Sequence, residues 1–423
     1  MDGQSHCGKS HAVGIFASRS VLLPMGDAHH GDGLVRQLIK SKGSPQFRQP
    51  QQQPDFFLAS AVRCDTISNE SSPNARKASV SMKTLDVHGG TGRSRLLVGE
   101  RLENLPRYLP SDRIIIVTDT IVRKLYEAQF PDVDMITIGV GENAKTLASA
   151  QDMYGALIDV EADRTTFIVG IGGGIVCDIT GFVASTYLRG VRFGFVATTL
   201  LAQVDASVGG KNGVNFRGFK NMVGVFNQPE FVICDLEMLR TLPRSERRSG
   251  FAEIIKHAAI GDPELFDFME KNCQGAETLN AAVIERFVYD SVSLKADIVG
   301  RDEKEAGERR KLNFGHTLGH AIERTTGVSH GEAVAAGMVF AADLSVARGL
   351  LDAAEAERLA ALIAAYGLPV AIPADATALI EALRRDKKRA GEGIHFVLLK
   401  GLGSAVVQEI PIAELEQALV ERK

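Results

Sequence analysis

The sequence predicts an α/β domain over residues 82–241, followed by a mainly helical domain over residues 242–423. Three observations predict this fold class. Short β-branched runs alternate with helical patterns from Lys83 onward, a glycine run at Gly170–Gly174 joins a strand to a helix, and strand-like runs nearly vanish after Thr241–Pro243. Alternating strands and helices of these lengths indicate a mostly parallel sheet with helices on both faces. We therefore expect ligands to bind at the carboxyl ends of the strands.

The expected strands come first along the chain. They are Arg113–Asp119, Asp134–Val140, Thr165–Gly174, Arg192–Thr199 and Glu230–Asp235. Apolar, β-branched runs of this kind are typical of strands buried on both faces of a sheet. Helical patterns lie between the strands, at Ile121–Phe130, Thr146–Val160 and Ile175–Leu188.

The later segments are helical by their apolar spacing and by their content of Ala, Leu and Glu. The predicted helices are Ser245–Ile260, Asn280–Gly300, His316–Thr325, Glu332–Gly349 and Ala354–Gly367. One late strand pattern, Gly393–Lys400, is expected to form a short hairpin beside the helical domain.

Composition and charge exclude several classes of partner. With 45% hydrophobic and 24% charged residues among 423, the chain is typical of a globular protein. A formal net charge of -4 gives no bulk positive field for nucleic acid or an anionic membrane. No apolar run reaches the roughly 18 residues that a membrane-spanning helix needs. The five scattered cysteines form no C-x-x-C pair, which favours a reducing compartment over a disulfide framework.

Residues 1–81 differ from the rest, because Gln, Ser, Asn and Gly recur there with little periodicity. We expect a disordered or weakly structured extension. Its serines and basic residues fit a transit peptide, whereas its acidic residues do not. We therefore expect a cytoplasmic protein, with organelle targeting by the extension as an alternative.

The glycine run Gly170-Ile-Gly-Gly-Gly174 indicates nucleotide binding. Glycines between a strand and a helix let the backbone approach a pyrophosphate, whose charge then faces the helix N-terminus. The match to G-x-G-x-x-G is imperfect because Ile175 holds the third position, and a simple tight turn is the alternative. Asp119, the turn Gly141–Lys145 and the Thr198-Thr199 pair should project from the same edge of the sheet, where a dinucleotide would lie.

Several cations indicate a small substrate that carries more than one negative charge. The segment Asp205–Lys211 places two glycines before a lysine, which suits a loop that closes on an anion. A solvated surface loop is the alternative. The further candidates for anion binding are Arg189, Lys220 with Asn221, Lys295 and Arg309.

Three histidines, His316, His320 and His330, lie within fifteen residues. On a helix the first two share a face, so spacing alone makes them a natural pair of metal ligands. Helix capping without any ligand is the alternative. Glu253 is a candidate third ligand, and it shares a helix face with Lys256 three residues on. A surface charge pair would give the same spacing.

The chain resembles the 3-dehydroquinate synthase family of sugar phosphate cyclases in six motifs, which occur in the family's order. They are GGGIVCDITGFVASTYLRG, TTLLAQVDASVGGK, KNMVGVFNQPEFVICD, AEIIKH, LNFGHTLGHAIE and HGEAVAAGM. The resemblance covers about residues 83–423. It implies a Rossmann-like α/β domain that binds NAD, a helical domain that binds zinc or cobalt, an active site in the cleft, and a homodimer.

The resemblance also implies roles for individual residues. The metal ligands would be Glu253, His316 and His330, which leaves His320 as an active-site histidine that does not bind metal. The catalytic residues would be Asp205, Lys256, Asn313 and His320. Substrate would contact Arg189, Lys211, Asn221, Lys295 and Arg309, with Arg189 reaching the neighbouring subunit. NAD would contact Asp119, Glu142, Lys145, Gly173, Gly174, Ile175, Asp178, Thr198, Thr199, Lys211, Lys220 and Thr241. A lysine of Asp386–Lys388 could also close on the substrate.

The activity that the resemblance implies is a phosphate-releasing carbon–oxygen lyase of aromatic amino acid biosynthesis. It would convert 3-deoxy-D-arabino-heptulosonate 7-phosphate to 3-dehydroquinate through transient oxidation by NAD, elimination, re-reduction and aldol closure. Another sugar phosphate cyclase and a metal-dependent polyol dehydrogenase are the alternatives. Two positions depart from the family pattern, Ala197 in place of Pro and Asn212 in place of Thr, and they put only fine positioning in question.

Overall fold

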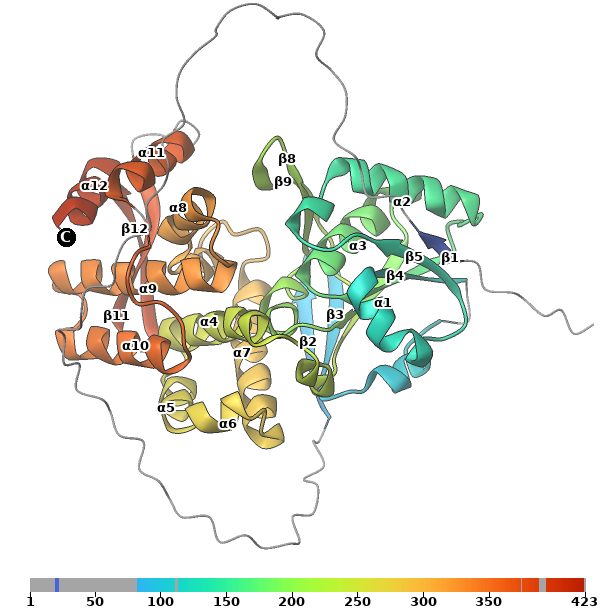
Figure 1. The fold of residues 1–423 in the computed structure, drawn as a ribbon, viewed down its shortest axis with the longest axis horizontal. Helices are drawn as coiled ribbons and strands as arrows, with labels where there is room; N and C mark the ends of the chain where they lie inside the picture. The colour runs from blue at the N-terminus through green and yellow to red at the C-terminus, as the bar shows by residue number, and fades with distance from the viewer. Residues whose placement is uncertain (1–19, 23–81, 111–112, 374, 388–392, 422–423) are drawn as a thin grey trace, which may run out of the picture. The chain divides into compact units, whose positions relative to one another are not determined.

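An eight-stranded sheet organises the first part of the fold (Figure 1). The computed structural model describes residues 20–22, 82–110, 113–373, 375–387 and 393–421. Of the predicted extension over residues 1–81, the described part is Ser20–Leu22, which forms strand β1 beside β5 (Asp134–Ile138). The remainder of that prediction lies outside the described residues.

The strands follow the order β1–β5–β4–β6–β7–β10–β3–β2 across the sheet. The remaining bounds are β2 Lys83–Gly89, β3 Gly92–Val98, β4 Ile114–Asp119, β6 Phe167–Gly172, β7 Arg192–Ala197 and β10 Phe231–Cys234. Neighbouring strands are parallel except β2 and β3, which form an antiparallel pair at one edge. All five predicted strands are confirmed, each slightly shorter than predicted. The sequence patterns did not identify the β2–β3 pair.

Helices cover both faces of this sheet. Successive strand residues point to opposite faces, so Ile115 and Ile116 belong to two separate cores. Helices α2 (Leu147–Asp159) and α3 (Gly174–Thr186) contribute to the core of Ile115. Helix α1 (Thr120–Tyr126) contributes to the core of Ile116. Burial on both faces explains why the strands are continuous apolar runs.

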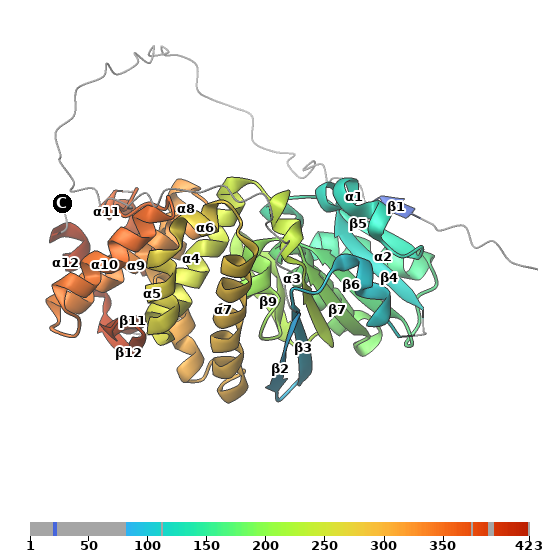
Figure 2. The same cartoon turned by 90° about the horizontal axis from the view of Figure 1, so that it is seen from below.

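The second part of the fold is mainly helical, as predicted. Its helices are α4 Arg244–Gly261, α5 Pro263–Lys271, α6 Cys273–Glu277, α7 Ala281–Arg301, α8 His316–Thr326, α9 His330–Ala347, α10 Ala353–Ala365, α11 Ala376–Lys387 and α12 Ile412–Glu421. The predicted late strand is confirmed as β11 (Gly393–Gly401), which pairs with β12 (Ser404–Pro411) in a hairpin. Helix α7 lies against the β2 edge of the sheet, and so joins the two parts (Figure 2).

One predicted loop has a different structure. Two further antiparallel strands, β8 (Lys211–Phe216) and β9 (Phe219–Phe226), carry Lys211, Lys220 and Asn221. The loop predicted over Asp205–Lys211 is therefore wrong at its end, because Lys211 begins β8, and the glycines of this polar run hid the alternation of the strand. Buried Asn212 ties the hairpin down, because its Nδ2 donates to the carbonyls of Gly210 at 3.0 Å and Asn227 at 2.8 Å.

The predicted loop at Asp386–Lys388 is helical through Lys387, the last residue of α11, and Lys388 lies outside the described residues. The described residues belong to one compact unit, so the division into domains at residue 241 stays a prediction. In the part of the chain that the structure describes, no helix combines the length and the apolar character that crossing a membrane requires.

Candidate active site

Glu253, His316 and His330 converge on one point. Their ligand atoms all lie within 4.8 Å of one another. Glu253 Oε1 lies 3.1 Å from His330 Nε2 and 3.6 Å from His316 Nε2, and the Glu253 side chain is fully buried. On its other side the His316 ring has Nδ1 at 3.1 Å from the Phe314 carbonyl oxygen. A proton on Nδ1 donates to that carbonyl and leaves the Nε2 lone pair facing the carboxylate, as a metal ligand requires.

Close packing of three helices brings these ligands together. Glu253 lies on α4, His316 begins α8 and His330 begins α9. A Cβ on Gly337 would lie 2.0 Å from the Gly315 carbonyl oxygen, so only glycine lets α9 approach α8 this closely. A Cβ on Gly331 would lie 2.3 Å from Ser249 Cα, which shows the same close approach of α9 to α4.

His320 stands beside this cluster and not in it. Its ring is 5.4 Å from the His316 ring, centroid to centroid, as their shared helix face predicts. The group that can hold a metal nevertheless joins His316 to His330 and Glu253. Spacing alone favoured His316 and His320 as the ligand pair, because it could not show that the turn after α8 folds His330 back onto His316.

Buried cations and carboxylates surround the cluster. Lys256 forms an ion pair with Glu253 Oε2, and Lys256 Nζ lies 3.8 Å from Asp205 Oδ1. Lys295 Nζ donates to the same Asp205 oxygen at 2.6 Å and to the Asp205 backbone carbonyl at 2.5 Å. Asp205 itself lies in a π-helical turn, Ala202–Ala206, of the kind found at many functional sites. The surface-pair alternative for Glu253 and Lys256 is wrong, because both side chains are buried.

The charges in this network set one another's pKa values. Burial alone would raise the pKa of Asp205, but the ammonium groups of Lys295 and Lys256 hold it well below its usual range. Burial lowers the pKa of Lys295 to about 8 even though Asp205 opposes the change. Burial would also lower the pKa of Lys256, but Glu253 and Asp205 raise it above its ordinary value.

The two histidines of the cluster have opposite charge states without a metal. Burial, followed by repulsion from Lys256, lowers the pKa of His316 to about 3. Burial also acts to lower the pKa of His330, but Glu253 and Glu323 raise it to about 9. His316 is therefore neutral and ready to bind a metal, whereas His330 must first lose a proton.

A second group, Asp205, Glu253 and His257, also has ligand atoms close together. The two lysines next to Asp205 already neutralise it, and a dication in their place would be repelled. The group of Glu253, His316 and His330 offers one carboxylate and two imidazoles, a donor set that fits zinc or cobalt.

A second polar cluster contains further predicted substrate residues. Lys211 and Asn313 both donate to the Glu305 carboxylate. Arg309 is buried, and its Nη1 donates to the carbonyls of Gly209 at 3.0 Å and Glu303 at 2.5 Å. By contrast, Arg189 is exposed and makes no hydrogen bond or ion pair with other described residues.

Several of the predicted nucleotide contacts lie at or just after the carboxyl ends of neighbouring parallel strands, such as Asp119 at the end of β4, Gly173 after β6 and Thr198 after β7. Gly173 precedes α3 with no side chain capping the helix, so the first amide groups stay available to an anion. A Cβ on Gly173 would lie 3.0 Å from Thr199 Cγ2, and one on Gly174 would lie 3.0 Å from Ala206 Cβ. Glycine at these two positions therefore allows the start of α3 to pack closely against Thr199 and Ala206.

Other predicted nucleotide residues already have partners. Asp119 Oδ1 caps α1 by accepting from the amides of Ile121 and Val122 at 2.8 and 2.9 Å. Lys145 Nζ donates at 2.5 Å to Asp178 and at 2.5 Å to Asn221. Thr241 Oγ1 lies 2.6 Å from the Tyr126 hydroxyl. Glu142 and Lys220 lie 3.8 Å apart, measured from Oε1 to Nζ.

The sequence patterns missed two glutamates that touch these clusters. Glu305 joins Lys211 to Asn313, and Glu323 lies between Lys220 and His330. Glu323 had a detectable signal, because it follows His316 by seven residues and so continues the helix face of His316 and His320. Glu305 comes from a turn with no periodic pattern, so its sequence gave no signal.

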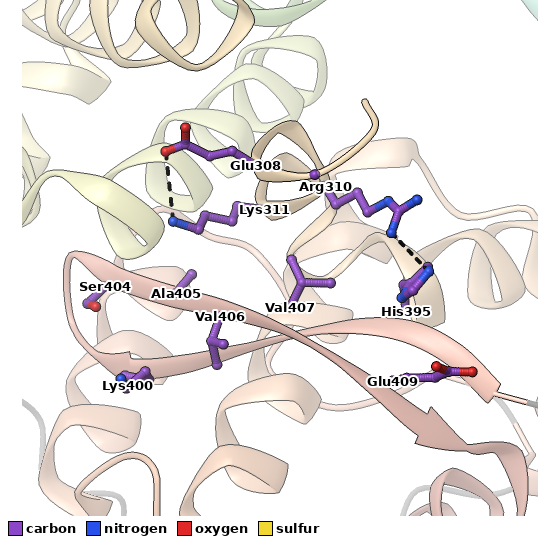
Figure 3. Close-up of a pocket in the computed structure, with 11 residues that line it drawn as sticks. Glu308, Arg310, Lys311, His395, Lys400, Ser404, Ala405, Val406, Val407 and Glu409 are labelled. Atoms are coloured by element: carbon purple, nitrogen blue, oxygen red, sulfur yellow. Dashed lines mark hydrogen bonds and ion pairs between the residues drawn. The ribbon is translucent and has the colours of Figure 1, made fainter. Parts of the chain in front are cut away.

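A cavity near the β11–β12 hairpin lies apart from the predicted site residues. A cavity of about 560 Å³ lies between residues 307–311 and the β11–β12 hairpin, and Figure 3 shows Arg310 paired with His395 and Lys311 paired with Glu308 on its wall. None of the predicted site residues lines it. The active-site candidate is therefore defined by its convergent ionisable groups.

Two family models match the chain. The one described as 3-dehydroquinate synthase N-terminal matches residues 135–249, and the one described as 3-dehydroquinate synthase C-terminal matches residues 250–389. The 3-dehydroquinate synthase of Halorhodospira halophila (strain DSM 244 / SL1) is 44% identical over 326 residues, covering 75% of this chain and 92% of the relative. That of Teredinibacter turnerae (strain ATCC 39867 / T7901) is 41% identical over 358 residues, covering 81% and 99%.

Solved structures with this fold include two other cyclases. A 2-deoxy-scyllo-inosose synthase complexed with carbaglucose-6-phosphate, NAD+ and Co2+ has a TM-score of 0.72 and 26% identity, covering 80% of this chain and 100% of its own. The 2-epi-5-epi-valiolone synthase of Streptomyces hygroscopicus subsp. jinggangensis 5008, with NAD+ and Zn2+ bound, has a TM-score of 0.71 and 30% identity, covering 78% and 97%. A probable glycerol dehydrogenase from Sinorhizobium meliloti 1021, at 16% identity and a TM-score of 0.53, shares the fold.

The close approach of α9 to α4 makes Gly331 a sensitive position. We expect Gly331→Ala to lower the free energy of unfolding by about 1–3 kcal/mol through overpacking, and to weaken metal retention. Denaturant unfolding and metal analysis measure both effects. Gly155→Ala is the control, because a Cβ there meets nothing within 4 Å. Equal stability of the two variants would contradict the packing argument.

The charge of His330 predicts how metal affinity depends on pH. Below its pKa of about 9 the imidazolium must release its proton before it can bind, so affinity for zinc should rise about tenfold per pH unit up to that value. Competition with a chelator of known pH dependence measures the affinity. A constant affinity between pH 7 and pH 9 would show that no proton leaves.

Proposed function

The chain belongs to the 3-dehydroquinate synthase family, and we infer that it converts 3-deoxy-D-arabino-heptulosonate 7-phosphate to 3-dehydroquinate and phosphate. The observation that carries this inference is the convergence of Glu253, His316 and His330 beside a network in which buried Lys256 and Lys295 flank partly buried Asp205. The relatives named 3-dehydroquinate synthase match most of the chain at 41–44% identity. The protein is therefore a lyase of the shikimate pathway that depends on NAD and a divalent metal.

The residues present fit both groups. Glu253, His316 and His330 would hold zinc or cobalt, and the open N-terminus of α3 at Gly173–Gly174 would face the pyrophosphate of NAD. Around it the dinucleotide would contact Asp119, Glu142, Lys145, Ile175, Asp178, Thr198, Thr199, Lys211, Lys220 and Thr241. When bound, NAD supplies a reversible hydride acceptor and the metal supplies a Lewis acid that acidifies a hydroxyl.

The side chains of the site hold and move protons. Lys295, whose pKa is about 8, exchanges its proton close to physiological pH, and Asp205 accepts its hydrogen bond. Lys256 stays protonated because Glu253 and Asp205 raise its pKa, so it can stabilise negative charge that develops on a substrate oxygen. His320 and Asn313 are proposed to complete the proton-transfer and orienting groups.

The charged side chains of the second cluster fit the substrate's carboxylate and phosphate. Lys211 is half-exposed and paired with Glu305, so it can exchange this partner for a substrate anion. Arg309, held by two backbone carbonyls, is fixed in place for the same purpose. Asn221 adds a polar contact from the hairpin.

Two alternative activities are less well supported. The inosose and valiolone synthases share the fold at 26% and 30% identity, below the 41–44% of the dehydroquinate synthases. The probable glycerol dehydrogenase shares the fold alone. A dehydrogenase would release NADH, whereas the proposed reaction returns the hydride within each turnover.

A homodimer and a cytoplasmic location are also part of the proposal. Exposed Arg189 supports the dimer, because the family resemblance gives this arginine to the neighbouring subunit's site. Sedimentation of the full chain measures the oligomer, and a monomer would contradict it. Cys177, Cys234 and Cys273 are free thiols, which supports a reducing compartment.

Turnover of the heptulosonate phosphate tests the proposed reaction directly. Zinc-loaded protein with substoichiometric NAD should release one phosphate for each substrate consumed and accumulate no net NADH. Phosphate analysis and absorbance of NADH measure the two quantities. Stoichiometric NADH from a simple polyol, without phosphate release, would identify a dehydrogenase instead.

The proposed roles of His330 and His320 can be separated by mutation. His330→Ala should lose bound metal together with activity, because it removes a ligand. His320→Ala should keep the metal and lose turnover by a factor of about 10²–10⁴, typical of an acid–base group. Metal content and kcat measure the two effects. Equal loss of metal in both variants would refute the ligand assignment.

A further inference from the structure

Glu323 lies between two cationic side chains that come from different parts of the fold. Its Oε2 is 3.7 Å from His330 Nδ1, and its Oε1 is 2.6 Å from Lys220 Nζ. Only 14% of the Glu323 side chain is exposed, so the carboxylate is largely withdrawn from water. The proposed reaction gives no role to either of these two ion pairs.

The Glu323 carboxylate faces the ring of His330, the proposed metal ligand, at an ion-pair distance of 3.7 Å. His330 Nε2 faces Glu253, and Nδ1 faces Glu323 on the opposite side of the ring. At 3.7 Å the carboxylate lies beyond hydrogen-bond distance, but its charge favours a proton on Nδ1, which leaves Nε2 as the lone pair that faces the metal position. His316 receives its orientation from the Phe314 carbonyl, a neutral acceptor that lies within hydrogen-bond distance at 3.1 Å.

The contact with Lys220 leads to the proposed nucleotide site. Lys220 lies on β9, and its Nζ is also 3.8 Å from Glu142 Oε1. Glu142 in turn accepts from Asn215 Nδ2 at 2.8 Å, and Lys145 donates to Asn221 on the same hairpin. A continuous series of polar contacts therefore runs from the turn after β5, through the β8–β9 hairpin, to a metal ligand.

We propose that Glu323 is a positioning residue that orients His330 for metal binding, and that its ion pair with Lys220 makes metal binding and NAD binding reinforce each other. The proposal rests on the proposed function, because it assumes both ligands. Positioning by Glu323 acts through His330 alone. The coupling acts through Lys220, whose place depends on a hairpin that the nucleotide would touch.

Glu323→Gln tests the positioning, because the amide keeps the shape and loses the charge. Zinc affinity of the metal-free protein, measured by chelator competition above pH 9 where His330 has already lost its proton, should fall about 10–100-fold. The visible spectrum of the cobalt-loaded variant should shift as well, a change that a purely structural ion pair would not cause. Glu357→Gln, at an exposed position on α10, is the matched control and should keep the wild-type affinity and spectrum.

The Glu253→Gln variant distinguishes failure of the proposed metal site from failure of the proposed positioning role of Glu323. If this ligand variant binds zinc as tightly as wild type, the proposed metal site itself is wrong. If Glu253→Gln loses zinc while Glu323→Gln keeps both the wild-type affinity and the wild-type cobalt spectrum, the metal site stands and the positioning proposal is overturned.

Lys220→Met tests the coupling. In the wild type, saturating NAD should raise zinc affinity by up to about fivefold, the range expected for one partly exposed ion pair. The ratio should fall to about one in Lys220→Met, and the exposed Lys271→Met on α5 should keep the wild-type ratio. A wild-type ratio of one, or an unchanged ratio in Lys220→Met, would overturn the coupling.

Discussion

Burial of the Glu253 carboxylate is the constraint on which the rest of the site depends. A carboxylate with no access to water destabilises the fold by several kcal/mol unless charged or hydrogen-bonding groups surround it. Here Lys256 from the same helix and the rings of His316 and His330 supply that environment. Lys256 lies on α4, whereas His316 begins α8 and His330 begins α9. The packing of these three helices therefore determines the electrostatics of the site. The glycines at the helix crossings make this close packing sterically possible.

The sheet contributes through its topology. Parallel strands end at one edge, and the turns that follow them carry the groups suited to a dinucleotide, while β8–β9 extends from the same region toward α8. The proposed nucleotide site and the proposed metal site are thus built by different kinds of structure. Backbone amides at an open helix end serve the nucleotide, whereas side chains from packed helices serve the metal and the reacting carbons. A hydrogen bond between Asp205 and Lys295 connects the two sites, because Asp205 lies in the turn after β7 and Lys295 lies on α7.

Much of this arrangement could be predicted from the sequence, and the failures have physical causes. Apolar periodicity identified the five central strands and the main helices, since burial on both faces or along one stripe leaves a clear pattern. The edge pair β2–β3 and the hairpin β8–β9 were missed because half-exposed strands rich in Gly and charged residues lack that pattern. Spacing paired His316 with His320, since helix geometry is local, but whether His330 returns to the cluster depends on packing. The roles of individual residues in binding and catalysis were inferred from the motif resemblance, because hydrophobic periodicity carries no information about chemistry.

The pairing within the buried network has a consequence for how substrate reaches it. Two carboxylates, Glu253 and Asp205, and two ammonium groups, Lys256 and Lys295, cancel one another's charge. A divalent ion that binds beside this balanced set and displaces the proton of His330 therefore adds one net positive charge to the protein interior. Such a charge attracts polyanions over a distance of about one Debye length, roughly 8 Å at physiological ionic strength. Metal loading thus also turns a neutral site into an electrostatic attractor, and capture of a doubly anionic sugar would slow as salt is added.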